Sequence, residues 1–401
     1  MNPWLTIVGI GDDGIEGLTP AARRLVEGAE VILASERVLG RVSLDGVETH
    51  CWSSPMTGSL EQLRGWRGRN VVILATGDPM HYGVSALLSR HFPREEIRVV
   101  PAPSAFALAA ARMLWPLQEV ETLSLHGRPV ALIQPFIQPG ARLLVLTSGA
   151  GTVREVASIL CARGYGESKL AVLEHMGGEE ERIVTFAARD CGSRDFADFN
   201  TLAVECAGAD SAPVLPRVPG LPDDVFVNDG LLTRREIRAA TLAALAPVPG
   251  ALLWDAGAGS GSVAIEWMRA ARGARAIAFE QHPRRLEAIA ENALALGTPG
   301  LDVVAGEMPD TLAGQERPAA IFLGGAVSSE PVFAACWEAL LPGGRLVANA
   351  VTLEGESALI ARQAQLGGDL VRIAVAHLAP VGRLRALRPR MDVLQWRVAK
   401  V

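Results

Sequence analysis

Short apolar runs recur along the first 206 residues and alternate with stretches whose apolar positions have helical spacing. Runs of this kind, bounded by Gly, Pro or charged residues, are typical of buried strands. Thr19 followed by Pro20 marks a helix start, because Thr is a favoured N-cap and Pro suits the first helical position. Strands are predicted at residues 4–10, 31–34, 71–75, 97–100, 123–126, 143–147, 170–173, 182–186 and 201–205, and helices at 19–29, 82–91, 105–114 and 153–163. The pattern predicts a two-lobed α/β domain whose second lobe is rich in strands.

The second half of the chain has a more regular rhythm. Strands are predicted at residues 251–254, 276–279, 301–304, 320–323 and 345–350, and helices at 263–271 and 283–296. The stretch from about residue 370 to 399 holds two long strand-like runs, broken near Pro380–Arg390. The rhythm predicts a doubly wound, Rossmann-like parallel sheet closed by an antiparallel pair, with ligands at the carboxyl ends of its strands.

A Pro-rich segment separates the two halves, with prolines at positions 213, 216, 219 and 222. This spacing favours an extended segment and excludes a continuous helix. We therefore predict a domain at residues 1–206, a linker at 207–222 and a second domain at 223–401. The glycine loops of the two halves differ in spacing, which indicates two unrelated domains rather than a duplication.

Composition excludes several classes of protein. The chain has 401 residues, is 49% hydrophobic and carries a formal net charge of −6, so it is neither disordered nor suited to broad contact with nucleic acid. Its five Cys and seven His are scattered, which predicts neither a disulfide framework nor a metal site. We expect no signal peptide and no membrane span, and a reducing, cytoplasmic setting.

A glycine loop follows the first predicted strand of the second half. Asp255 ends this strand, and Gly257, Gly259 and Gly261 follow at alternate positions. Such a turn lets backbone N–H groups approach a ligand closely. A nicotinamide site would have Gly at the sixth position of G-x-G-x-x-G, where this chain has Ser262. The G-x-G-x-G form favours S-adenosylmethionine instead, with Asp255 within reach of the methionyl amine.

The next strand ends support this interpretation. Glu280 ends the second strand, where a carboxylate can bind both ribose hydroxyls, and Gly306–Met308 follows the third, where adenine is expected. The fourth strand ends in Gly324–Gly325, without the Asn-Pro-Pro-Tyr type of motif that holds an exocyclic base amine. The second half is therefore predicted to be a methyltransferase domain whose substrate is not a nucleic acid.

Glycine-rich loops also follow strands of the first half, at residues 8–14, 75–83, 101–106 and 124–128. One such loop is weak support for a ligand site. Loops at successive strand ends together predict a large cleft with exposed backbone donors and acceptors.

These loops resemble those of the tetrapyrrole (corrin/porphyrin) methyltransferase family. The resemblance rests on Gly9–Gly11, on Ala75–Pro79 with its following Gly83, and on Ser124–Arg128. The last motif is similar to that of the branch that methylates carbon 5 of the corrin precursor. The second half resembles enzymes that decarboxylate the ring C acetate and methylate carbon 15, through Asp229–Arg238 ahead of the glycine loop. The fused order resembles the bifunctional precorrin methyltransferases of cobalamin biosynthesis.

The resemblance implies one S-adenosylmethionine site in each domain, a precorrin substrate and a homo-oligomer. In the first domain it assigns the cofactor to Gly9, Gly11, Gly77, Asp78, Met80, Ser104 and Ala105. In the second, besides Asp255, it assigns Thr233, Gly257, Ala258, Gly259, Ser260, Gly261, Glu280 and Met308. The first loop departs from the family at Asp12, where Pro is usual, which bears on the tightness of the loop.

The expected chemistry requires few protein groups. A reduced tetrapyrrole has enamine-like carbons and can absorb the electron pair left by decarboxylation, so neither a catalytic base nor a metal is needed. Its many carboxylates predict arginine forks. The predicted substrate contacts are Arg238, Arg383, Arg385, Arg388 and Arg390, and the candidates for a catalytic role are His126, Arg234 and Arg235. The alternatives are a solvated hairpin for the C-terminal arginines and, for His126, a structural histidine that bonds a loop carbonyl.

Other functions stay open at this point. The substrate could be the cobalt-containing precursor. Fused methyltransferases acting on RNA or protein would need a basic face or an amide-binding motif. A non-catalytic S-adenosylmethionine sensor would bind without turnover, and a nicotinamide enzyme would need the missing glycine.

Overall fold

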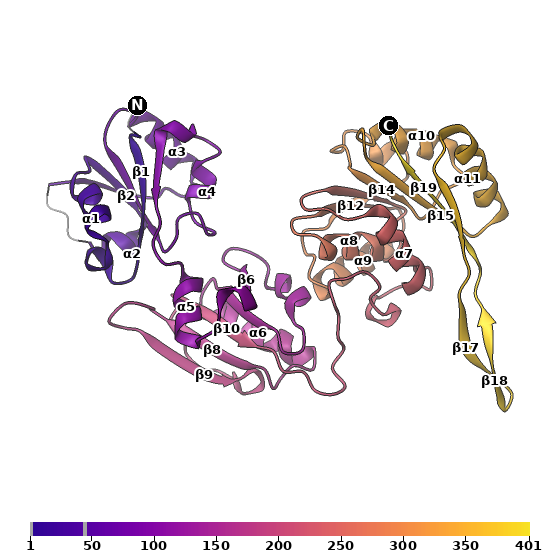
Figure 1. The fold of residues 1–401 in the computed structure, drawn as a ribbon, viewed down its shortest axis with the longest axis horizontal. Helices are drawn as coiled ribbons and strands as arrows, with labels where there is room; N and C mark the ends of the chain where they lie inside the picture. The colour runs from indigo at the N-terminus through magenta and orange to yellow at the C-terminus, as the bar shows by residue number, and fades with distance from the viewer. Residues whose placement is uncertain (1–2, 43–45) are drawn as a thin grey trace. The chain divides into compact units, whose positions relative to one another are not determined.

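The computed structural model describes residues 3–42 and 46–401, which form two compact units (Figure 1). The first, called the N-unit, comprises the chain up to Val130 together with Gln138–Pro213. The second, called the C-unit, comprises Val214–Val401 together with the short segment Ala131–Ile137. Both units are α/β folds with their own buried clusters of apolar side chains, as predicted.

The first sheet of the N-unit is parallel, with the strand order β3-β2-β4-β1-β5. Its strands are β1 (Leu5–Ile10), β2 (Val31–Ala34), β3 (Glu48–Cys51), β4 (Val71–Thr76) and β5 (Ile97–Val100), and its helices are α1 (Pro20–Glu27), α2 (Glu36–Leu39), α3 (Thr57–Gly65) and α4 (Ser85–Leu88). Thr19 caps α1 as predicted, since its hydroxyl accepts from the amide N–H of Ala22. Apolar clusters on both faces of the sheet explain why every residue of β1 and β2 is buried.

The second sheet of the N-unit is mostly antiparallel, with the order β6-β7-β10-β8-β9. Its strands are β6 (Glu121–Ser124), β7 (Arg142–Leu146), β8 (Lys169–Glu174), β9 (Arg182–Ala187) and β10 (Asn200–Glu205), and its helices are α5 (Ala105–Met113) and α6 (Ala150–Ala162). Helix α5 packs on β7 and β10 through Phe106 and Ala109, which are buried with Leu144 and Ala203. This sheet is the predicted strand-rich second lobe.

The main sheet of the C-unit has the order β13-β12-β11-β14-β15-β19-β16. Its strands are β11 (Leu252–Ala256), β12 (Arg275–Glu280), β13 (Asp302–Ala305), β14 (Ala320–Leu323), β15 (Arg345–Ala350), β16 (Asp369–Ile373) and β19 (Val393–Ala399). Its helices are α7 (Arg235–Leu245), α8 (Ser262–Ala270), α9 (Pro283–Ala295), α10 (Glu330–Ala339) and α11 (Leu353–Leu366). Strands β11 to β15 are parallel, and β19 runs antiparallel to both β15 and β16. The predicted doubly wound sheet with an antiparallel closing pair is confirmed.

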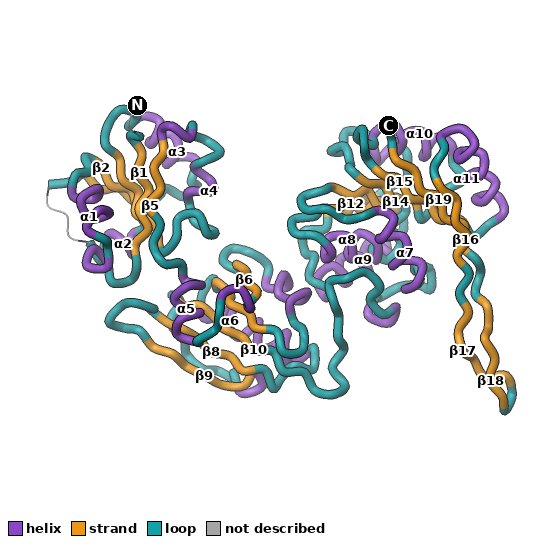
Figure 2. Tube along the Cα trace, viewed as in Figure 1, coloured by secondary structure: helices purple, strands orange, loops and turns teal. Residues whose placement is uncertain are grey.

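A hairpin of β17 (Ala376–Val381) and β18 (Leu384–Pro389) projects from this sheet (Figures 1 and 2). Every residue of β18 is exposed. The sequence predicted a break near Pro380–Arg390, with a solvated hairpin as the alternative for the arginines of this stretch. The strands of the hairpin contain Pro380 and Pro389. Both prolines are tolerated in the ribbon since each of its strands keeps one unpaired edge.

The Pro-rich segment at residues 207–222 is held by protein contacts. Residues up to 213 belong to the N-unit and those from 214 to the C-unit. Leu215 and Leu221 are buried in the core of the C-unit, and the carboxylate of Glu266 accepts from the backbone N–H groups of Gly220 (2.6 Å) and Leu221 (2.9 Å). The second part of the segment is therefore an integral layer of the C-unit.

One predicted helix is much shorter in the structure. The stretch 82–91 was expected to be helical, but only Ser85–Leu88 forms α4. Tyr82 has φ of 59°, in the left-handed region that stops a right-handed helix. Among the helices that the structure describes, none combines the length and the apolar character needed to cross a bilayer.

Candidate functional site

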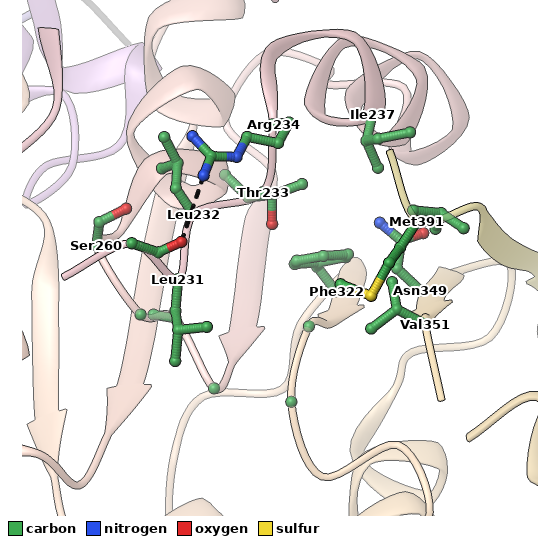
Figure 3. Close-up of a pocket in the computed structure, with 18 of the residues that line it drawn as sticks. Leu231, Leu232, Thr233, Arg234, Ile237, Ser260, Phe322, Asn349, Val351 and Met391 are labelled. Carbon is green, nitrogen blue, oxygen red and sulfur yellow. Dashed lines mark hydrogen bonds between the residues drawn. The ribbon is translucent and has the colours of Figure 1, made fainter. Parts of the chain in front are cut away.

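A cavity of about 1180 Å³ opens at the carboxyl ends of the parallel strands of the C-unit (Figure 3). It is bounded by the glycine loop after β11, the end of β12, the start of α7 and the base of the β17–β18 hairpin. Strand order reverses between β11 and β14, which is where ligands bind in open α/β sheets. The volume exceeds the roughly 300–1,000 Å³ of small-molecule pockets, so the cavity has room for more than one such ligand.

The glycine loop forms one wall of this cavity. Gly257 and Gly259 have φ of 79° and 59°, a region in which a side chain is strained. A β-carbon on Gly257 would also lie 3.1 Å from the backbone of Gly325. Gly261 does not line the cavity, and a β-carbon there would lie 3.1 Å from the side chain of Ile289 in α9. The first two glycines therefore keep the ligand wall open, and the third allows close helix packing.

Asp255 is buried below this loop and does not line the cavity. Its Oδ2 accepts from the amide N–H of Ala264 (3.1 Å), whereas no described residue donates to its buried Oδ1. Burial raises the pKa of this carboxyl to about 7, and the charge of Glu280 acts in the same direction. A buried acceptor without a donor indicates a water or a ligand group at this position.

Glu280 lines the cavity at the end of β12. Its Oε2 accepts from the N–H of Gly259 (2.9 Å), and its Oε1 accepts from those of Gln281 (2.9 Å) and His282 (3.0 Å). The carboxylate thus fixes the glycine loop to the start of α9. Since an ionised carboxylate has about four acceptor positions, it keeps capacity for a ligand hydroxyl.

The opposite wall is formed by side chains that sequence reasoning missed, namely Phe322, Asn349, Val351 and Met391 (Figure 3). Asn349 donates through Nδ2 to Thr241 Oγ1 (2.9 Å) and accepts at Oδ1 from Gln395 Nε2 (2.9 Å). The available signal was an amide inside the otherwise apolar end of a predicted strand. Its partners come from distant parts of the chain, which no local pattern reveals.

The prediction that Arg238 contacts the substrate is wrong, because this residue does not line the cavity. Its side chain has no exposed surface. It donates to Glu266 Oε1 (2.6 Å), to Asp223 Oδ1 (3.2 Å) and to the carbonyl oxygens of Leu221 and Thr233. Four acceptors surround this guanidinium, so it stabilises the fold and cannot reach a ligand.

The other arginines divide by position. Arg234, at the N-cap of α7, lines the cavity and forms an ion pair with Asp223 (3.6 Å), whereas Arg235 does not line it. Arg388 and Arg390, at the base of the hairpin, line the cavity. Arg383 and Arg385 lie near the hairpin tip, away from it, where the solvated alternative describes them better.

Most of the predicted cofactor residues of the C-unit meet at this cavity. Those that line it are Thr233, Gly257, Ala258, Gly259, Ser260, Glu280 and Met308. Asp255 and Gly261 lie directly behind the wall, as described above. The loops after three adjacent parallel strands thus converge, as their positions in the sequence predicted.

A second cavity, of about 550 Å³, lies in the N-unit and is lined from both of its sheets. Of the residues predicted for the cofactor, Gly11, Gly77, Asp78, Ser104 and Ala105 line it. Met80 does not line it and is 53% exposed. Gly9 lies behind the wall, where a β-carbon would meet the carbonyl oxygen of Gly77 and lie 2.6 Å from the amide nitrogen of Ala102.

His126 also lines this second cavity. Its Nδ1 lies 3.0 Å from the carbonyl oxygen of Thr147, and because a carbonyl can only accept, Nδ1 is the donor. In the neutral ring Nε2 is then an acceptor. The histidine therefore bonds a loop carbonyl, as its structural alternative required, and also borders the cavity.

Asp12, which replaces the usual Pro of the first loop, is the centre of an ion network. Its buried carboxylate lies 2.5 Å from Arg37, 3.0 Å from Arg41 and 3.2 Å from Nδ1 of His175. Arg37 also stacks over the ring of Phe199, 3.7 Å from its centroid. These contacts join the first sheet to the second lobe, so the departure at Asp12 has a structural role.

Comparison with known proteins follows the same division of the chain. Residues 4–191 match the family of tetrapyrrole (corrin/porphyrin) methylases, and residues 224–400 match the precorrin methyltransferase domain. A precorrin-6Y C(5,15)-methyltransferase [decarboxylating] of a Sinorhizobium species is 46% identical over 99% of this chain and 96% of its own length. Two shorter relatives from Salmonella typhimurium are each 30% identical. One, a cobalt-precorrin-7 C(5)-methyltransferase, covers 45% of this chain and 88% of its own length. The other, a cobalt-precorrin-6B C(15)-methyltransferase (decarboxylating), covers 43% of this chain and 92% of its own length.

Proposed function

This chain belongs to the family of decarboxylating precorrin-6Y C(5,15)-methyltransferases, and from this premise we propose how its two units divide the reaction. The N-unit methylates carbon 5 of a precorrin. The C-unit removes the ring C acetate carboxyl as carbon dioxide and methylates carbon 15. The observation that carries this division is the presence of a separate glycine-walled cavity in each unit.

S-adenosylmethionine supplies the electrophilic methyl group in each unit. The residues of the C-unit fit this cofactor, because a buried acceptor without a donor, Asp255 Oδ1, lies behind the glycine loop. This atom would accept from the methionyl ammonium, directly or through a water. Glu280 would accept from the ribose, and Met308 would border the adenine. In the N-unit, Gly11, Gly77 and Ser104 would hold the second cofactor.

The protein's main task in each unit is to align the nucleophilic carbon with the methyl group and to exclude water. Substrate carboxylates would be bound by Arg234, Arg388 and Arg390, which line the cavity of the C-unit. In the N-unit, Arg37 and Arg128 line the cavity and would serve the same purpose. His126 Nε2 would face the tetrapyrrole as a hydrogen-bond acceptor.

The test is to incubate the full chain with S-adenosylmethionine and a metal-free precorrin, and in parallel with its cobalt complex. Mass spectrometry of the pigment should give two added methyl groups and the loss of one carbon dioxide. We expect turnover of the metal-free pigment, and turnover of the cobalt complex alone would assign the alternative substrate. Cofactor binding without any change of either pigment would contradict the proposed function.

Cofactor binding in the C-unit should depend on pH through Asp255. Its carboxyl, with a pKa near 7, is mostly protonated in the free protein below that pH. A bound ammonium favours the carboxylate, so binding releases a proton. Calorimetry should show the affinity of one of the two sites falling about tenfold per pH unit below pH 7, since one proton is released. The Asp255→Asn variant should lose this dependence. A pH-independent wild type would contradict the contact.

We further propose that the protein is a homo-oligomer whose contact includes the hairpin. Leu378 and Leu387 are opposite each other on this ribbon and therefore share one face. They are 62% and 68% exposed, and an isolated two-stranded ribbon is at best marginally stable in water. A second copy of the chain would cover this face. Light scattering after gel filtration should give more than one chain per particle, and Leu387→Ser should shift it toward the monomer. A monomeric wild type would contradict the proposal.

A further inference from the structure

Decarboxylation leaves a chemical requirement that the residues discussed so far do not meet. When the bond between the acetate methylene and its carboxyl breaks, carbon dioxide leaves and the electron pair passes into the conjugated tetrapyrrole. The methylene carbon then needs one proton to become a methyl group. A group that can hold and release a proton near neutral pH must therefore reach the substrate.

The described residues offer few proton donors at the cavity of the C-unit. Its titratable side chains, apart from arginines, are Glu236, Glu280, His282, Glu307 and His377. Glu280 is already fixed by three backbone N–H groups. His282, two residues after Glu280, lies with it on the cofactor side, as does Glu307, the neighbour of Met308. Glu236 and His377 lie on the substrate side, with the arginines of the hairpin base.

His377 is the only imidazole on that side among the residues that the structure describes. Its Nε2 lies 3.8 Å from Oε2 of Glu236, in the first turn of α7. Arg388 is its directly opposite neighbour on β18. The ring therefore lies between a carboxylate and a guanidinium on the substrate side of the cavity.

The imidazole of His377 is partly exposed, so a proton that it gives to the substrate can be replaced from water. The side chains of His377 and Glu236 are 46% and 43% exposed, so water can reprotonate the ring after each turnover. Arg388 and Arg390 lie beside it and form no ion pair with any described residue. They would attract the carboxylate arms of a tetrapyrrole to this wall. The acetate arm and the imidazole are thus brought to the same side of the cavity.

We propose that His377 is the catalytic acid of the decarboxylation and that Glu236 positions it. Nε2–H of the imidazolium gives its proton to the methylene carbon as the carbon–carboxyl bond electrons return from the macrocycle. The neutral ring then regains a proton from water. This assignment rests on the proposed function of the C-unit.

The test compares wild type with His377→Gln, which keeps a hydrogen-bonding side chain but cannot donate a proton of this acidity. Carbon dioxide release from the precorrin should fall about a hundredfold, the lower range of general acid catalysis. Cofactor affinity and methylation at carbon 5 should stay within twofold. His91→Gln, an exposed histidine of the N-unit, is the matched control and should have wild-type rates.

The pH profile separates catalysis from a structural effect. The wild-type rate of decarboxylation should depend on pH, and His377→Gln should abolish this dependence. Glu236→Gln should lower the rate and keep the pH dependence, because the imidazole remains but loses the contact that positions it. Carbon dioxide release by His377→Gln within tenfold of wild type would overturn the assignment of His377. Wild-type protein that releases no carbon dioxide would overturn the proposed function as well.

Discussion

A fragment comprising residues 214–401 is expected to release carbon dioxide from the precorrin and to add one methyl group, with complete loss of methylation at carbon 5. The fragment lacks the segment Ala131–Ile137 of the C-unit. Both buried clusters of the C-unit draw their residues from Leu215 onward, so the fragment keeps its core. Starting it at residue 223 would remove Leu215 and Leu221, both buried, and should reduce its stability. Mass spectrometry of the pigment gives the number of methyl groups and the loss of carbon dioxide together.

The complementary fragment, residues 1–213, should release no carbon dioxide and should add at most the carbon-5 methyl group. Mixing the two fragments should restore both methylations, which controls for damage by truncation. Release of carbon dioxide by residues 1–213 alone would contradict the division of labour between the units.

The variant Gly9→Ala is expected to abolish cofactor binding in the N-unit and leave decarboxylation unchanged. The new methyl group would meet backbone atoms of Gly77 and Ala102 on the two loops that border the cavity, and backbone cannot move aside as a flexible side chain can. We expect at least a hundredfold loss of affinity, about 2.7 kcal/mol, so that calorimetry detects one binding site per chain instead of two.

Gly65→Ala is the matched control for this variant. Gly65 ends α3 of the same unit, is exposed, and a β-carbon there would have no atom within 4 Å. Alanine should be neutral or slightly stabilising at this helical position. Two intact binding sites in Gly9→Ala would show that the contact at Gly9 does not control the cavity.

The sheet strands could be predicted closely because local sequence determines them. Strands β2, β5, β14 and β15 have the bounds that the apolar runs indicated. In β2 and β14 every residue is apolar and buried, as a strand covered on both faces requires. Strand β3 was missed, because its residues are polar and mostly exposed. The hairpin was predicted only as the solvated alternative for the C-terminal arginines, because an exposed two-stranded ribbon has no buried face to impose an apolar pattern.

The candidate site could be predicted where backbone conformation decides it. Glycines that must adopt positive φ, such as Gly257 and Gly259, leave a signal in the sequence itself. Asn349 and His377 depend on contacts with residues far away in the chain, Gln395 and Glu236. The sequence does not reveal these contacts, although Asn349 is marked by being an amide in an apolar strand end. The prediction for Arg238 was wrong because sequence reveals a charge but not its burial. In the sequence, a buried arginine with four acceptors cannot be distinguished from an exposed one.

The hydrogen bonds accepted by Glu266 have a consequence for how a chain with two fused domains could arise. This nearly buried carboxylate joins the last prolines of the segment, through Gly220 and Leu221, to Arg238 of α7. The segment that precedes α7 is therefore bound to the C-unit itself. A junction between two genes upstream of this segment would not disturb the contacts of Gly220 and Leu221 with Glu266. Two genes could be joined at such a position by a single recombination event that leaves every contact of Glu266 in place.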